Sequence, residues 1–131
     1  KEILEAHPMK KRITLLEGSS TSPEIISRIR KIIRPKDTVL VCLDSDHRGC
    51  HVYEELNCYK DLVSRGSYVV VFDTFIPYLK GLEGLKPEVA ADTPMDAVDR
   101  FLAENKNFAV DEYYHKFFVS SCPRGFLKRV I

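Results

Sequence analysis

The sequence lacks three features, each of which would indicate a particular class of protein. Its four cysteines form no CxxC pair, it has no apolar run of about 18 residues, and it has almost no excess of charge. Twenty basic residues face nineteen acidic ones, for a net charge of +1, so no large field attracts nucleic acid or an anionic membrane. We expect neither partner. Because the cysteines do not have the spacing of a metal or redox site and no signal peptide is recognisable, we expect a cytoplasmic protein whose cysteines are small buried side chains.

The most informative stretch is VLVCLDSDH, residues 39–47. With 131 residues, 44% of them hydrophobic, the chain is expected to form one domain, residues 1–131, with a substantial core. The apolar half of this stretch predicts a strand buried on both faces. It ends in Asp44, Asp46 and His47. Because open parallel sheets bind ligands outside the carboxyl ends of their strands, we expect the chemistry here.

The remaining sequence predicts alternating strands and helices. Residues 1–7 resemble the end of a helix that has no capping signal at its start, and Pro8 ends it. Ser22, Pro23 and Glu24 predict a helix start, as do Thr93, Pro94 and Asp96. A further helix is predicted over 51–63 with Gly66 as its cap, a long loop over 75–91, and strands over 12–16, 67–74, 108–110, 114–119 and 126–130. Late strands that are joined without a helix between them should be antiparallel.

Four segments together resemble a known family. ITLLEGSSTSPEI, VLVCLDSDH, HVYEEL and GSYVVVFDT follow one another as in the cephalosporin hydroxylase and rhamnosyl O-methyltransferase family. The resemblance implies an α/β class I methyltransferase fold, Rossmann-like, with a mainly parallel sheet and an antiparallel C-terminal end. It implies S-adenosylmethionine as methyl donor, a hydroxyl of a sugar or small secondary metabolite as acceptor, and a magnesium site. Because family members often assemble, a homo-oligomer remains open.

The resemblance also assigns roles to residues. Gly18, Ser19 and Ser20 match the loop that contacts the donor's adenine, and Asp44 counts among the cofactor-binding residues as well. Asp44 and Asp73 match two magnesium carboxylates, and His47 lies where related enzymes place the base that removes the hydroxyl proton. Taken singly, the Gly18–Ser20 loop is more typical of a helix-capping turn and either aspartate of a capping acid, and it is their combination that favours a site. His47 is equally typical of a capping or orienting histidine.

The sequence departs from the family in two places. Phe72 stands where the family has a glutamate, so one metal ligand is missing. The family's glycine-rich loop and ribose-binding acid should precede Lys1, so the chain resembles the C-terminal part of a catalytic domain that lacks its first strands.

Three alternatives stay open. Asp44 and Asp46 form a DxD pair, as in metal-dependent glycosyltransferases that use nucleotide sugars. His47 and His51 have the i, i+4 spacing of zinc ligands, although the glutamate of an HExxH motif is absent. The third alternative is a degenerate domain that serves only in assembly.

Overall fold

At the centre of the protein, the described residues form a four-stranded mixed sheet. The computed structural model describes residues 2–79, 81, 84–116 and 120–131, and within them the strand order is β1-β2-β4-β3. The strands are β1 (Val41–Leu43), β2 (Tyr68–Val71), β3 (Phe108–Val110) and β4 (Phe126–Arg129). β1 and β2 are parallel, whereas β4 is antiparallel to both β2 and β3. The predicted antiparallel C-terminal end is confirmed, but one parallel pair out of three does not make these strands a mainly parallel sheet.

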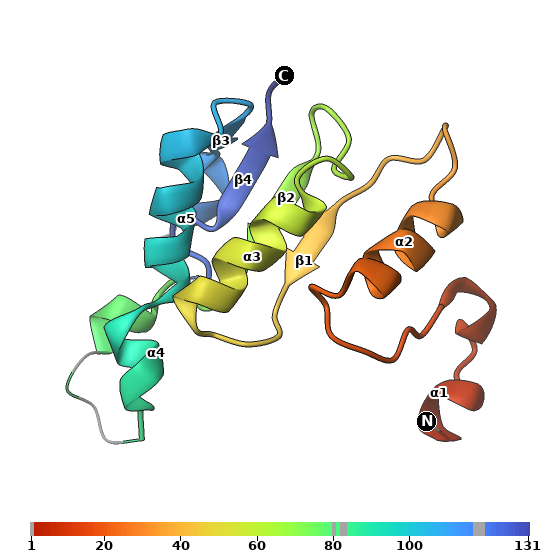
Figure 1. The fold of residues 1–131 in the computed structure, drawn as a ribbon, viewed down its shortest axis with the longest axis horizontal. Coiled ribbons are helices and arrows are strands. Elements are labelled where there is room, and N and C mark those ends of the chain that lie inside the picture. The colour runs from red at the N-terminus through yellow and green to blue at the C-terminus, as the bar shows by residue number, and fades with distance from the viewer. Residues whose placement is uncertain (1, 80, 82–83, 117–119) are drawn as a thin grey trace.

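Helices cover one face of this sheet. In Figure 1, α3 and α5 lie side by side in front of the strands, and they contact each other along their length. Their buried side chains, such as Leu56 and Phe101, pack against Val69, Val71 and Leu127 of the sheet to form the core. The helices are α1 (Glu2–Glu5), α2 (Pro23–Ile32), α3 (Gly49–Tyr59), α4 (Pro87–Ala91) and α5 (Pro94–Glu104), with 3-10 turns η1 (Lys10–Arg12), η2 (Ile76–Leu79) and η3 (Glu112–His115).

Both predicted capping signals start helices. Ser22 Oγ accepts a hydrogen bond from the backbone N–H of Ile25, and Pro23 takes the first position of α2. At α5, Thr93 and Asp96 form a reciprocal capping box, in which each side chain accepts from the other's backbone N–H. These interactions fix the entry of α5 beside the loop that follows β2.

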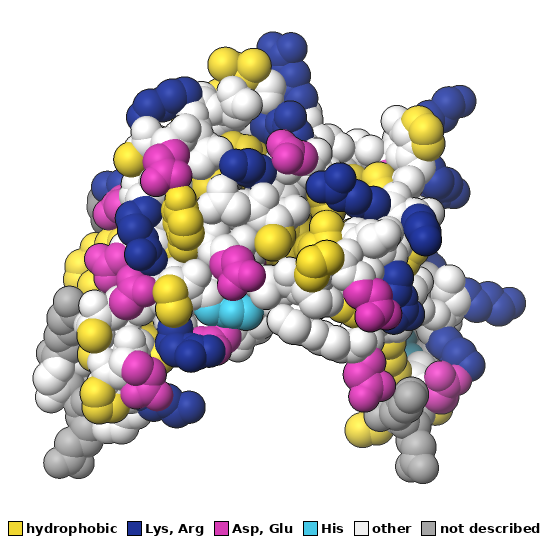
Figure 2. Space-filling model, in the orientation of Figure 1, with side chains coloured by type: hydrophobic (Ala, Val, Ile, Leu, Met, Phe, Trp, Pro, Cys, Tyr) yellow, Lys and Arg dark blue, Asp and Glu magenta, His cyan; other side chains and the backbone are white. Residues whose placement is uncertain are grey.

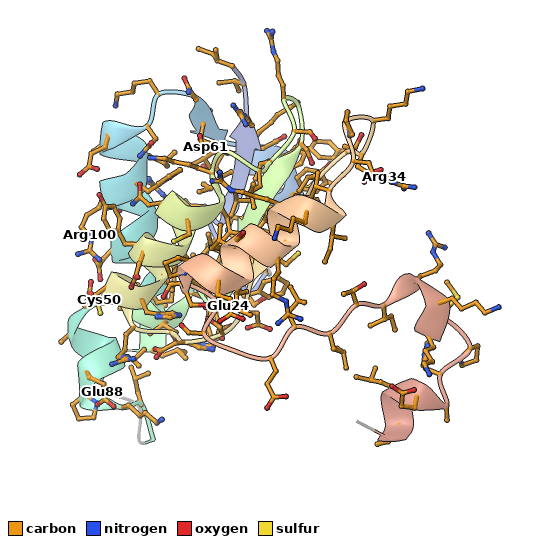
Figure 3. The ribbon with its side chains drawn as sticks, turned by 45° about the vertical axis from the view of Figure 1, so that its right-hand side comes forward. Glu24, Arg34, Cys50, Asp61, Glu88 and Arg100 are labelled. Carbon is orange, nitrogen blue, oxygen red and sulfur yellow. The ribbon has the colours of Figure 1, made fainter. Side chains whose placement is uncertain are left out.

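The predicted strand over 12–16 is wrong. Residues 10–12 form η1, residues 13–17 have no regular structure, and Ile13 and Leu15 are exposed. In Figures 1 and 3 this N-terminal segment lies apart from the sheet. A β-branched sequence becomes a strand only when a partner strand satisfies its backbone, and this segment pairs with none among the described residues.

Three further boundaries differ from prediction. The helix predicted over 51–63 runs from Gly49 to Tyr59, and Gly66, at φ 80°, turns the chain into β2 instead of capping that helix. The loop predicted over 75–91 contains η2 and α4. Of the strand predicted over 114–119, residues 114–116 belong to η3 and the turn after it, whereas 117–119 lie outside the described residues.

The strand that begins the predicted site is less buried than expected. β1 is an edge strand among the described residues, and Leu40 and Cys42 are exposed, so it is not buried on both faces. The cysteine prediction fails for Cys42 and Cys50, which are exposed, and holds for Cys122, which is buried.

The surface agrees with the balanced composition. On the face shown in Figure 2, basic and acidic side chains are interspersed. None of the helices within the described ranges is both long and apolar enough to cross a membrane.

Candidate functional site

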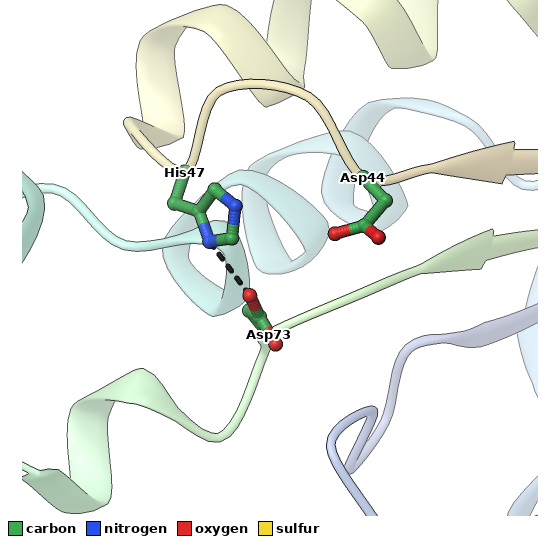
Figure 4. A group of neighbouring side chains, drawn as sticks. All are labelled: Asp44, His47 and Asp73. Atoms are coloured by element: carbon green, nitrogen blue, oxygen red, sulfur yellow. Dashed lines mark ion pairs between the residues drawn. The ribbon is translucent and has the colours of Figure 1, made fainter.

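Asp44, His47 and Asp73 meet at one edge of the sheet. One possible ligand atom from each residue lies within 4.8 Å of those of the other two. Among the described residues, these side chains form a group that could hold a metal ion. Asp44 directly follows β1, and Asp73 lies two residues after β2 (Figure 4). Because β1 and β2 are adjacent and parallel, their carboxyl ends lie side by side, as the sequence predicted. The cluster offers two carboxylates and one imidazole to a ligand.

His47 and Asp73 form a direct pair. His47 Nδ1 lies 2.7 Å from Asp73 Oδ2, the dashed line in Figure 4. Asp73 has φ 57°, a left-handed conformation that aspartate tolerates better than most residues, and the resulting turn directs its carboxylate back toward the loop after β1. A carboxylate that accepts from Nδ1–H fixes the tautomer and orientation of the ring, which leaves Nε2 as the basic nitrogen.

Asp46 has a different partner. Its carboxylate accepts hydrogen bonds from Arg48 Nε at 3.0 Å and from Arg48 Nη2 at 2.5 Å. These hydrogen bonds hold the pKa of Asp46 far below its usual range. Asp46 therefore pairs with arginine and does not join Asp44 at a shared metal, so the structure does not support the DxD alternative.

His51 also points elsewhere. Its Nε2 lies 3.3 Å from Ser20 Oγ and 3.6 Å from Glu55 Oε1. His47 lies in the loop before α3 and not on the helix, so the two imidazoles do not share a helical face. The zinc pair suggested by their spacing is not formed.

The loop over Gly18, Ser19 and Ser20 packs against α3. The backbone oxygen of Ser20 accepts from Tyr59 Oη at 2.7 Å, and Ser19 is exposed. Gly18 has φ 147°, and a Cβ there would lie 2.9 Å from Ile25 Cγ1, so the position requires glycine. The structure thus brings Asp44, His47 and Asp73 together. The Gly18–Ser20 loop contacts α3 nearby, where Ser20 Oγ lies within hydrogen-bond distance of His51.

A cavity of about 550 Å³ opens beside His47. Its walls come from the loop after β1 and from the segment that contains η2 and α4, and they mix apolar and charged side chains. The lining residues are Ser45, Asp46, His47, Arg48, Ile76, Gly84, Leu85, Lys86, Glu88 and Val89. This volume is typical of sites for small molecules. Described residues of the predicted 75–91 loop therefore lie beside His47, the predicted base.

Glu55 was not among the residues predicted from the sequence. This residue is 2% exposed and its Oε1 accepts a hydrogen bond from Ser45 Oγ at 2.8 Å. A signal was present, because Glu55 falls between Val52, Leu56 and Tyr59 on the apolar face of a helix, where an unpaired acid is rare.

Fold and site together are consistent with a methyltransferase-like domain: a mixed α/β sheet with a carboxylate–histidine cluster at the ends of its parallel strands. The sequence matches the family described as rhamnosyl O-methyltransferase/CmcI over residues 1–130, so the chain belongs to that family. The rhamnosyl O-methyltransferases of Mycobacterium tuberculosis (strain H37Rv) and Mycobacterium bovis (strain AF2122/97) are each 32% identical to it over 124 residues. The match covers 89% of this chain and 47% of each relative, so the chain spans about half their length. No solved structure matches it.

Proposed function

We propose that this chain carries part of the active site of an S-adenosylmethionine-dependent O-methyltransferase that acts on a hydroxyl of a sugar or small metabolite. The observation that carries the proposal is the convergence of Asp44, His47 and Asp73, of which His47 lines a cavity of small-molecule size, in a chain of this family. Residues 1–131 act as one unit of a class I, Rossmann-like fold. Among the described residues β1 pairs on one side only, which supports this, because further parallel strands of such a sheet would pair on its other side.

His47 is the proposed general base. A neutral hydroxyl is a poor nucleophile until its proton is removed, and an imidazole can accept that proton near neutral pH. His47 borders the cavity, and Asp73 holds its ring through Nδ1. His47 Nε2 therefore takes the proton from the acceptor hydroxyl, while Asp73 stabilises the protonated ring.

The donor would lie against the Gly18–Ser20 loop and Asp44. S-adenosylmethionine supplies an electrophilic methyl group on sulfur. The exposed Ser19 hydroxyl fits the edge of an adenine ring, because a hydroxyl both donates and accepts hydrogen bonds. Ser20 is held on α3 by Tyr59, which gives the loop a fixed position.

A magnesium ion fits the cluster only in part. Asp44 and Asp73 offer the carboxylate oxygens that Mg²⁺ prefers, whereas His47 offers nitrogen and Phe72 offers nothing. With two carboxylates and the remaining positions filled by water or acceptor, we expect weak binding, in the millimolar range. The ion would supply electrostatic stabilisation of the acceptor oxygen.

The test is methyl transfer by the full-length protein to a panel of sugar and phenolic acceptors. His47→Ala should lower turnover by roughly 10² to 10⁴-fold, the usual range for loss of a general base, with little change in affinity for S-adenosylhomocysteine. His51→Ala should have a smaller effect, and the exposed His7→Ala serves as the matched control. A folded protein that neither binds this ligand nor transfers methyl would contradict the proposal and favour an assembly role.

A further inference from the structure

Glu55 is a buried carboxylate that the proposed chemistry does not use. Its Oε1 accepts from Ser45 Oγ at 2.8 Å. Its Oε2 is also buried and has no hydrogen-bond partner among the described residues. Burial of a carboxylate is unfavourable unless hydrogen bonds compensate it, and most buried polar atoms have partners. An apolar side chain of the same size would pack more favourably here, so the carboxylate calls for a role other than stability.

Its partner is part of the site. Ser45 lies between Asp44 and Asp46 in the loop that ends at His47. Glu55 also lines a gap of about 10 Å³ together with Asp44, His47 and Phe72. A gap of this size holds about one water molecule, which would give Oε2 a donor. Glu55 thus lies directly beneath the loop that carries the proposed base.

A second contact connects Glu55 to the other proposed site loop. His51 Nε2 lies 3.6 Å from Glu55 Oε1 and 3.3 Å from Ser20 Oγ. Ser45 therefore contacts Glu55, Glu55 lies beside His51, and His51 contacts Ser20. Glu55 and His51 are one turn apart on α3, so the helix holds both loops on one rigid element.

We propose that Glu55 is a positioning residue for the site, an inference that rests on the proposed function. Through Ser45 it fixes the direction of the 44–47 loop, and through His51 it fixes that loop relative to the Gly18–Ser20 loop. It does not touch the acceptor. Its effect is to keep His47 at the place where donor and acceptor meet, since misplacement of about 1 Å is enough to lower turnover strongly.

The test replaces Glu55 by methionine, which has similar length and no acceptor oxygen. Because a buried oxygen without a hydrogen-bond partner among the described residues is removed, the melting temperature should stay equal or rise. Turnover should nevertheless fall by roughly 10- to 100-fold, as for other groups that orient a site residue, with acceptor KM nearly unchanged. Glu55→Gln keeps one acceptor oxygen and should restore part of the turnover. Glu54→Met makes the same change at the exposed neighbouring position and should have no effect.

A second measurement does not depend on activity. The ring signals of His47 in a carbon–proton NMR spectrum should shift in Glu55→Met and remain at their wild-type positions in Glu54→Met. If turnover and His47 signals are both unchanged, or if activity falls only in parallel with stability, the positioning role is wrong. If the wild-type protein transfers no methyl group, the proposed function fails, and the His47 signals alone then decide the role of Glu55.

Discussion

The contact between His47 and Asp73 allows us to predict how far turnover falls when Asp73 is replaced. Asp73→Asn removes the negative charge but keeps the size of the side chain, and asparagine tolerates the φ of 57° at this position, so the backbone should not change. A hydrogen bond to a charged group contributes roughly 1.5–3 kcal/mol. Both side chains are about one third exposed, so solvent screening favours the low end of that range. We expect turnover to fall by about 10-fold, since each 1.36 kcal/mol is a factor of ten.

The assay is methyl transfer under saturating donor, with Mg²⁺ varied from zero to about 10 mM around the expected millimolar affinity. If Asp73 acts mainly by orienting His47, added Mg²⁺ should not restore the activity of Asp73→Asn, and the His47→Ala/Asp73→Asn double variant should be no slower than His47→Ala alone. Asp61→Asn is the control, because Asp61 is an exposed aspartate that follows the C-terminal end of α3, whereas the 44–47 loop precedes the N-terminal end of that helix. Wild-type turnover in Asp73→Asn would refute the reasoning. Full recovery with Mg²⁺ would assign Asp73 to the metal alone.

Three further predictions concern the donor loop, the metal and the capping box. Ser19→Phe should weaken S-adenosylhomocysteine binding, measured by calorimetry, without lowering the melting temperature, because Ser19 is exposed; unchanged affinity would remove the loop from the site. Asp44→Asn should abolish the response of activity to millimolar Mg²⁺, and tight binding that survives this change would place the ligands elsewhere. Thr93→Ala should lower the free energy of unfolding in urea by about 1 kcal/mol, and an unchanged midpoint would show that the box contributes nothing.

Helix starts were predictable because their causes are local. At α2 the cap and its partner are Ser22 and Ile25, three residues apart, and at α5 they are Thr93 and Asp96. The sequence within one turn contains the donor, the acceptor and the proline that presets the first helical residue. No distant contact is needed to choose these starts, so the prediction depends on no assumption about the fold.

Strands were harder because their partners are distant in sequence. Ile13 and Leu15 have the residue types of a strand, but the segment has no neighbour to complete its hydrogen bonds among the described residues. The burial of Cys42 likewise depends on what lies across β1, and β1 pairs only with β2 within the described sheet. The local sequence does not show which strand, if any, lies beside a segment. A pattern of β-branched residues therefore predicts that a segment tends to form a strand, but not which strand it pairs with.

The meeting of the candidate residues was predictable because topology decides it, whereas the side-chain partners that depend on packing were not. Asp44 and Asp73 follow strands that are parallel neighbours, so their meeting follows from the strand order alone. The pairing of Asp46 with Arg48 and the burial of Glu55 depend on side-chain orientations that a sequence pattern does not fix.

The antiparallel end of the sheet contributes to the site although it carries none of the proposed site residues. Thr74, fully buried next to Asp73, donates a hydrogen bond to the backbone oxygen of Pro123 at 2.7 Å. Gly125 lies so close to β2 that a Cβ there would collide with the backbone oxygen of Val71. The turn before β4 therefore packs against the end of β2 and fixes the backbone there. Asp73 takes its left-handed conformation on this part of the backbone. Since that conformation directs the carboxylate at His47, the geometry of the proposed base depends on a turn some fifty residues further along the chain.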